Sequence, residues 1–382
     1  MSFMKSFNYK QNLLKINWLK RLILSITKPS WAMKVSFFVP SNQSNFLEFE
    51  GWRLKWVFKY LKRKIYIRIF TRQDLLLENI PKDAKRILWI NLSAPSLGDS
   101  LMDLSGRVLL ERFKIDLLTD PKNVELYQND VFFDNVFCYS KEVLDEGLSS
   151  SYDLFILDSF SPRVVRVMKS ISSKTPFVGM WEFINGFEVH RTIYSFARIH
   201  YLIGSSSANN MPVTPILNLN NSKPIDFQRE ITKPLIAVVV GAEWQYRRYD
   251  KWVDVIGSLI ADYEIILVGS GNGKKDAAEV TRQFQSCHDF VGKCSLIDTS
   301  QLISMANVVI AADGGLWHVA CALGKPTVGL FAAMPIFDIN GKRVNRDTSD
   351  MTCETVYDPI AVSNIPSAEV VSAVSRLLNK LG

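Results

Sequence analysis

A short stretch around Asp313 combines an acid, two glycines and a helical pattern in an order that suits phosphate binding. Asp313 follows the β-branched run 307–311, which is typical of a strand buried on both faces of a parallel sheet. Gly314 and Gly315 let the backbone turn sharply, so that an anion can approach the first amides of the helix predicted over 316–323. Because open α/β sheets bind ligands at the carboxyl ends of their strands, an acid at this place favours a ligand site.

A second loop of small residues follows an earlier predicted strand. The apolar run 87–92 leads into residues 93–100, which combine serines, a proline and Gly98 before a helical pattern begins. Asp99 therefore lies at a helix start, where a carboxylate interacts favourably with the helix dipole. It could instead be a functional residue near the mouth of a cleft between the two domains. The spacing leaves both interpretations open.

Alternating strand and helix patterns from residue 86 onward predict an α/β protein with two doubly wound sheets. The first series of strand patterns covers residues 87–92, 115–119, 131–138, 152–158 and 176–180. The second series covers residues 235–240, 263–268, 307–311 and 327–331. Helical patterns cover residues 97–113, 252–260, 276–285, 302–306 and 367–381.

We divide the chain into four segments. A basic amphipathic extension covers residues 1–85, a first Rossmann-like domain covers 86–225, and a second covers 233–365. A stretch rich in Ser, Asn and Pro within 205–232 is interpreted as the linker. The last segment, 366–382, is expected to form a helix that can cross back to the first domain.

Positive charge is concentrated in the N-terminal segment. Residues 1–90 contain 18 Lys and Arg against 5 Asp and Glu, whereas the rest of the chain contains 27 and 33. Residues 13–26 and 52–61 mix these cations with aromatic and aliphatic residues, a composition that suits helices in an anionic membrane interface. Residues 1–80 are therefore a candidate membrane surface, although the same helices could pack on the protein and expose their lysines to water. No nucleic-acid-binding motif accompanies the charge, so no nucleic-acid partner is expected.

Composition also argues against several classes of protein. No apolar run reaches the roughly 20 residues of a membrane-spanning helix, and no secretory cleavage site follows the N-terminus. The five cysteines show neither metal-type nor redox-type spacing, which fits reduced thiols in a cytoplasmic protein. The four histidines form no clustered motif, so a histidine-rich metal site is not expected.

Three motifs together resemble those of the glycosyltransferase family 9 heptosyltransferases. They are Ser-Leu-Gly-Asp at 96–99, Gly-Lys-Cys-Ser-Leu at 292–296 and the long glycine motif at 313–326. The resemblance covers residues 86–335 and implies a GT-B fold, with two Rossmann-like domains facing a central cleft and no obligatory metal or other cofactor. Family enzymes add ADP-activated heptose to the lipopolysaccharide inner core, which implies a peripheral protein at the cytoplasmic face of the bacterial inner membrane.

The resemblance also implies roles for matching residues. Asp99 would be the general base that deprotonates the acceptor hydroxyl, with Ser96 and Gly98 on the acceptor side. Asp313 would hold sugar hydroxyls of the donor, while the following amides would receive its diphosphate in place of a metal. The donor-side residues are Asp313, Gly314, Gly315, Leu316, His318, Arg247, Arg248, Lys293 and Ser295.

For some donor-side residues, more than one role stays open. Either Arg247 or Arg248 would face the diphosphate, since a guanidinium can bind two phosphate oxygens at once. His318 could contact phosphate or pack between helices, and packing is favoured for its neighbour Trp317. Lys293 and Ser295 are expected near the nucleotide without a defined contact.

Other parts depart from the family pattern. The loop 269–276 lacks the usual ribose-binding acid, which Asp276 or Glu279 would replace. After Phe331 the chain reads Ala-Ala-Met-Pro, where the family typically has Gly-Pro-Thr. The stretch 181–200 is expected on the acceptor side without assigned roles, and its polar residues include Glu182, Glu188, His190 and Arg191.

The leading hypothesis is an inverting transferase that moves a sugar, heptose being favoured, from a nucleotide-diphosphate donor to a lipopolysaccharide-core, lipid-linked or other oligosaccharide acceptor. Inversion follows if Asp99 activates the acceptor for one in-line displacement, since no second carboxylate is evident for a covalent intermediate. A nucleotide-sugar epimerase can use the same fold, and a membrane-associated scaffold could keep the fold without catalysis.

Overall fold

The computed structural model of this 382-residue chain describes residues 54–94, 96–146, 148, 151–182, 191–205, 214–219, 231–332 and 352–381. The helix expected within residues 13–26 therefore lies outside the described residues. So do Glu188, His190 and the Ala-Met-Pro segment that follows Ala332.

The first domain is built on a five-stranded parallel sheet in the order β3-β2-β1-β4-β5. Its strands are β1 (Arg86–Asn91), β2 (Lys114–Thr119), β3 (Asn135–Cys138), β4 (Leu154–Leu157) and β5 (Phe177–Gly179). Its helices are α5 (Leu97–Asp103), α6 (Pro121–Tyr127), α7 (Lys141–Glu146), α8 (Pro162–Ile171) and α9 (Arg191–Leu202). The chain order reverses direction between β1 and β4, so the loops after these two strands border the switch point of the sheet.

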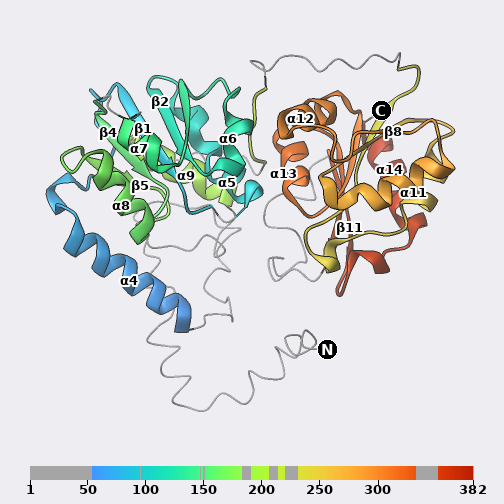
Figure 1. Ribbon diagram of the computed structural model, residues 1–382, viewed down its shortest axis with the longest axis horizontal. Helices are drawn as coiled ribbons and strands as arrows, with labels where there is room; N and C mark the ends of the chain where they lie inside the picture. Colours follow the sequence, from blue (N-terminus) through green and yellow to red (C-terminus); the bar gives the residue numbers. More distant parts are fainter. Residues whose placement is uncertain are drawn as a thin grey trace, which may run out of the picture.

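The second domain has a six-stranded parallel sheet in the order β11-β10-β9-β6-β7-β8. Its strands are β6 (Leu235–Val239), β7 (Glu264–Val268), β8 (His288–Asp289), β9 (Val308–Ala312), β10 (Thr327–Ala332) and β11 (Cys353–Asp358). Its helices are α10 (Trp252–Leu259), α11 (Lys274–Gln283), α12 (Leu296–Met305), α13 (Gly315–Ala322) and α14 (Ser367–Leu381). Here the switch point falls between β6 and β9. Two parallel sheets with flanking helices confirm the predicted fold class (Figure 1).

Both faces of each sheet are buried. In β1, Ile87 and Trp89 face one apolar cluster, whereas Leu88 and Ile90 face another that includes residues of α8. The first of these clusters continues into the second domain, where it includes Trp317 of α13. Strands covered on both sides read as continuous apolar runs, which is why their positions could be predicted from sequence.

The helix predicted over 97–113 is shorter than expected. The α-helix ends at Asp103, and a 3₁₀ segment, η4 (Ser105–Leu110), replaces its second half. The Ser105 hydroxyl donates to the carbonyl of Leu101 at 2.7 Å, and the Gly106 amide donates to the Ser195 hydroxyl of α9 at 2.9 Å. A Cβ on Gly106 would lie 2.7 Å from a backbone oxygen of α9. The close approach of α9 therefore accompanies the change of helix type.

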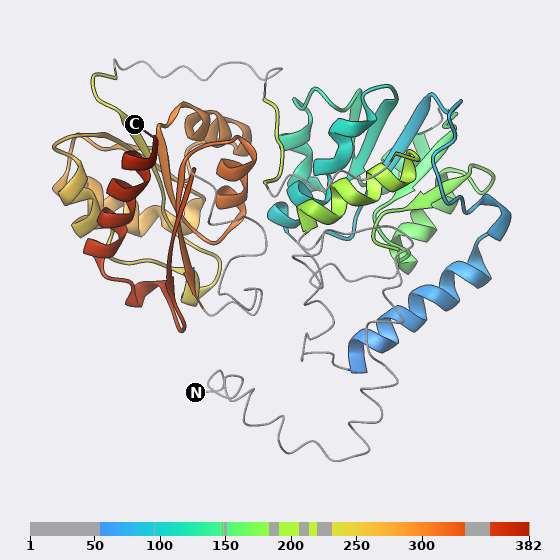
Figure 2. The ribbon, with the colours of Figure 1, turned by 180° about the vertical axis from the view of Figure 1, so that it is seen from behind.

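Two further helices belong to the predicted N-terminal extension and to the predicted C-terminal segment. Helix α4 (Leu54–Phe70), within the basic extension, packs next to α8 through Ile67, which belongs to the same cluster as Met168. Helix α14 was considered able to cross back to the first domain, but its described packing is on α10, β10 and β11 of the second (Figure 2). Among the described residues, no helix combines the length and apolar character needed to span a membrane.

Candidate active site

The glycine junction of the second domain has the predicted form. Strand β9 ends at Ala312, Asp313 follows, and Gly314 is the N-cap residue of α13 in extended conformation. As a glycine, this N-cap residue has no side chain with which to cap the helix. The first amides of a helix lack acceptors within it, so the α13 N-terminus offers donors and a positive dipole end to an anion.

Arg247 is the arginine that reaches this junction. It ends the short 3₁₀ segment η5 (Gln245–Arg247) in the loop after β6, the strand paired with β9. Its Nη2 lies 3.1 Å from Oδ2 of Asp313, whose side chain is 2% exposed, whereas the Arg247 side chain is 22% exposed. The cation can therefore pair with Asp313 and still face solvent.

The other predicted donor-side cations have different partners. Arg248 forms an ion pair with Asp276 at 2.8 Å, so the acid considered for ribose binding neutralises the second arginine. Lys293 pairs with Asp289, the last residue of β8, at 2.6 Å. Ser295 caps α12 in a reciprocal arrangement with Asp298.

In the first domain, Asp99 occupies the first turn of α5. Ser96 is the N-cap residue, and its hydroxyl accepts from the Asp99 amide at 3.3 Å and donates to Asp99 Oδ2 at 2.6 Å. Arg191, at the start of α9, lies 3.5 Å from Asp99 Oδ1 through its Nε. The Asp99 side chain remains 23% exposed, so it can still meet a substrate.

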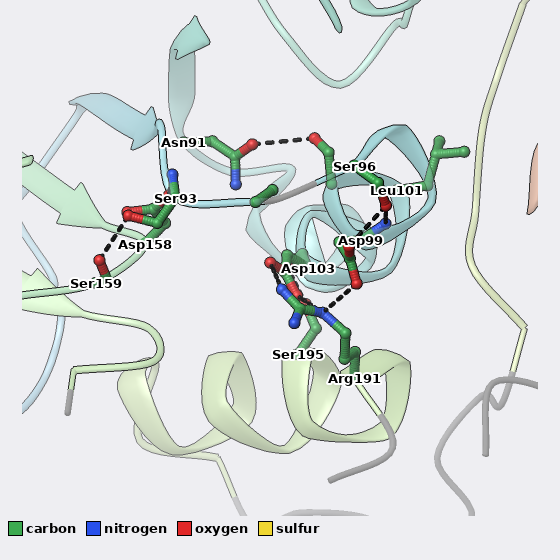
Figure 3. Close-up of polar contacts among 12 residues, drawn as sticks. Asn91, Ser93, Ser96, Asp99, Leu101, Asp103, Asp158, Ser159, Arg191 and Ser195 are labelled. Carbon is green, nitrogen blue, oxygen red and sulfur yellow. Dashed lines mark hydrogen bonds and ion pairs between the residues drawn. The ribbon is translucent and has the colours of Figure 1, made fainter. Parts of the chain in front are cut away.

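Arg191 joins Asp99 to a second carboxylate (Figure 3). Its Nε donates to Asp103 Oδ1 at 2.8 Å, and its Nη2 pairs with the other oxygen of Asp103. Burial raises the pKa of Asp103 to about 6, although the charge of Arg191 opposes that rise. The guanidinium also lies over the Trp181 ring at 4.9 Å. Asp103 and Trp181 therefore both hold the Arg191 guanidinium, next to the Asp99 carboxylate.

Loop and helix contacts bring the two junctions together. A Cβ on Gly98 of α5 would lie 2.2 Å from Cδ2 of His318 on α13. A Cβ on Gly315 would lie 3.3 Å from Leu97. The N-terminal halves of α5 and α13, each following a strand at a switch point, thus pack against one another. Gly98 and His318, which is 6% exposed, lie in this domain contact, as the packing alternative for His318 requires.

Comparison with protein families and with curated proteins finds similarity to heptosyltransferases. Residues 186–339 match the model of glycosyltransferase family 9 (heptosyltransferase). Lipopolysaccharide heptosyltransferase 2 of Salmonella typhimurium is 29% identical over 118 residues, which are 28% of this chain and 33% of that protein. The Escherichia coli protein of the same name is 28% identical over 117 residues, again 28% and 33% of the two chains. Over this part, the chain resembles the family 9 heptosyltransferases. It matches about a third of the length of these curated relatives.

Solved structures extend the likeness over both domains. E. coli ADP-heptose lps heptosyltransferase II has a TM-score of 0.58 at 17% identity, covering 78% of this chain and 100% of that one. A family 9 glycosyltransferase of Veillonella parvula has a TM-score of 0.63 at 15% identity, with 79% and 100% covered. At these identities the likeness establishes the GT-B fold.

The first domain also contains an acid that the sequence analysis did not single out. Asp158 follows β4 and is 1% exposed; its Oδ2 accepts from the Ser93 amide at 2.5 Å. The Ser93 hydroxyl lies 2.7 Å from that of Ser159, so the loops after β1 and β4 are joined at the switch point (Figure 3). An acid directly after a buried strand was the available signal, the same one that marked Asp313. Trp317 is fully buried against Phe331, as predicted.

Proposed function

We propose that this protein is an inverting glycosyltransferase that moves heptose from ADP-heptose to a lipopolysaccharide-core or related glycan acceptor. The observation that carries the proposal is the packing of α5 against α13, which sets the Asp99 loop beside the Asp313 junction. The family match over residues 186–339 supports the same reaction class. No metal is required in this proposal, because helix amides and an arginine meet the charge of the leaving group.

The donor diphosphate would bind at the α13 N-terminus. The amides of Gly314, Gly315 and Leu316 would donate to its oxygens. Arg247 would add a charge-assisted contact, and Asp313 would accept from sugar hydroxyls. The ADP donor also agrees with an E. coli heptosyltransferase of the same fold, whose solved complexes hold ADP and ADP-2-deoxy-2-fluoro heptose.

Transfer would proceed as a single displacement. An acceptor hydroxyl oxygen attacks the anomeric carbon while the bond from that carbon to the diphosphate oxygen breaks. The hydroxyl proton passes to the Asp99 carboxylate, and the nucleoside diphosphate leaves with the electron pair. The α13 amides and Arg247 stabilise the charge that builds on the leaving oxygen.

Arg191 would be a positioning residue for this base. Asp103 fixes its guanidinium, which in turn fixes one oxygen of Asp99, while Ser96 holds the other. The acceptor side would thus comprise Ser96 and the start of α9. An acceptor of this class is presented at a membrane, so we place the reaction at the cytoplasmic face of the bacterial inner membrane.

Two variants test the proposal. One should lose transfer but keep donor binding, and the other should lose donor binding. Asp99→Asn preserves size and an oxygen for Ser96 but cannot take a proton, so transfer should fall roughly 100-fold or more with donor affinity retained. Gly314→Ala adds a Cβ whose nearest contact is 3.8 Å away, so the fold should tolerate it. The methyl group would instead meet the diphosphate and weaken donor binding.

Transfer of radiolabelled heptose to a lipopolysaccharide-core acceptor, with calorimetric donor affinity, measures both effects. Unchanged turnover in Asp99→Asn would remove that residue from the mechanism. Incubation with donor alone separates an epimerase, which would invert the sugar without an acceptor. Equal donor affinity in Gly314→Ala would contradict the α13 diphosphate site.

A further inference from the structure

Helix α4 has a buried inner face and an exposed apolar outer face. Its inner face carries Arg63 and Ile67, which are 5% and 3% exposed and lie four residues apart, one turn along the helix. Ile67 packs in the cluster beneath α8. The charge of Arg63 lowers the pKa of Asp158, although burial raises it more strongly, so the inner face reaches the region of the first switch point. This face is already covered by the first domain.

The outer face carries a second row of apolar side chains. Phe58, Leu61, Ile65 and Ile69 are 67%, 39%, 56% and 66% exposed. Their spacing of three, four and four residues places them on one side of the helix, opposite Arg63 and Ile67. We call these four residues the outer ridge. An amphipathic surface helix normally has polar residues in this position.

The outer ridge is unusual within the described part of the chain. Five of the twelve large exposed apolar residues, the ridge and Phe70, belong to this one helix. The other seven are distributed over both domains. Scattered exposed apolar residues need no explanation, but a contiguous row on one helix marks a contact surface.

Charge identifies the partner. Helix α4 contains six basic residues and no acidic one. At 100° per residue, the exposed Lys62 and Arg68 flank the outer ridge on opposite sides. An apolar ridge bordered by cations matches a bilayer interface, where acyl chains lie beneath anionic headgroups. A protein partner with an apolar groove would not require a helix that lacks acidic residues altogether.

We propose that the outer ridge of α4 docks the protein on an anionic phospholipid bilayer, with the ridge in the headgroup boundary and Lys62 and Arg68 on lipid phosphates. The docking goes beyond the proposed transfer reaction and does not depend on it. It narrows the candidate membrane surface, residues 1–80, to one face of one helix. Figure 1 shows α4 at the edge of the first domain, next to α8.

Vesicle co-sedimentation of the full chain tests the docking. Wild-type protein should bind vesicles of phosphatidylglycerol and phosphatidylcholine in equal parts and should bind phosphatidylcholine alone far more weakly. Phe58→Glu/Ile69→Glu should weaken binding about tenfold or more, since it removes two inserted side chains and adds repelled charges. The matched control is Ile360→Glu, which alters a 68% exposed apolar residue of the second domain and should bind as wild type.

A separate pair of variants tests the contribution of the two flanking cations to vesicle binding. Lys62→Gln/Arg68→Gln should reduce affinity roughly tenfold and weaken its salt dependence. Lys82→Gln/Lys275→Gln removes two exposed cations elsewhere and should have little effect. Wild-type binding by the ridge variant would overturn the proposal. So would equal binding to neutral vesicles, or a ridge-dependent dimer in the absence of vesicle binding. Transfer to a soluble acceptor should persist in the ridge variant, which separates failure of docking from failure of the proposed reaction.

Discussion

Asp158 carries a buried carboxylate, and its Oδ1 has no hydrogen-bond partner among the residues that the structure describes. Burial raises its pKa from an ordinary value of 3.8 to about 7, although backbone amides and Arg63 favour the ionised form. Between about pH 4 and 7 the folded protein therefore holds a proton that the unfolded chain has released. The free energy of unfolding falls as pH rises through this window and levels off above about 7.

Asp158→Asn should remove this pH dependence. At pH 8 the variant should be more stable than wild type by roughly 2 kcal/mol or more, because wild type then buries a charge. Thermal unfolding at pH 8 and pH 5 measures the difference, which should be larger at pH 8. Asp153→Asn is the control with the opposite sign: the Arg86 and Lys85 amides lower the pKa of Asp153, so its loss should destabilise at pH 8. A lower melting temperature for Asp158→Asn at pH 8 would show that the charge at this position is stabilising.

Among the elements, the strands with continuous apolar runs were predictable, whereas two strands of the second domain were not. Strands β1 and β9 are continuous apolar runs, and their predicted ranges agree with the observed ones within one residue. The edge strands β8 and β11 were missed, because β8 has two residues and β11 mixes charged and apolar ones. Period and hydrophobicity report burial, and β8 and β11 are only partly buried.

The candidate site also has parts that the local sequence predicts and parts that it does not. Local sequence was sufficient for the strand–turn–helix junctions at Asp99 and Asp313, because each is formed by consecutive residues. It could not choose between Arg247 and Arg248, since their partners are distant in sequence: Asp313 follows β9, and Asp276 lies in α11. Nor could it pair Arg191 with Asp103, which is 88 residues away in the chain. Such pairings depend on tertiary packing.

The contact between α5 and α13 can be tested through Gly98. A Cβ there would lie 2.2 Å from the buried His318 ring, so Gly98→Ala must push the helices apart or move the ring. We expect a loss of about 1–3 kcal/mol, measured as a lower melting temperature. His318→Ser in the same background makes room and should recover part of the loss. Gly314→Ala, at the same junction but free of close contacts, should leave the melting temperature unchanged. Additive losses in the double variant would contradict this contact.

At the scale of the whole molecule, the fold brings two switch points into one place. The first domain contributes a carboxylate held by Ser96 and Arg191, and the second contributes a helix N-terminus and Arg247. The domains also meet where Glu125 of α6 accepts from the Ile297 amide of α12 at 2.9 Å. Each half supplies one part of the proposed reaction, so donor binding and base catalysis should be separable by mutation.

That separation predicts a pattern of ligand stabilisation in the full chain. A ligand at a hundred times its Kd stabilises the folded state by about 2.7 kcal/mol, so ADP and ADP-heptose should raise the melting temperature by several degrees. GDP- and UDP-sugars should raise it less. Asp99→Asn should keep the ADP-heptose shift, because its change lies on the acceptor side. Arg247→Ala should lose most of it, because the guanidinium leaves the diphosphate site and Asp313 loses its cation. Arg248→Ala is the matched control, since that arginine pairs with Asp276 instead. A larger shift with a UDP-sugar would reject adenine as the donor base, and equal shifts for both arginine variants would reject Arg247 as the phosphate contact.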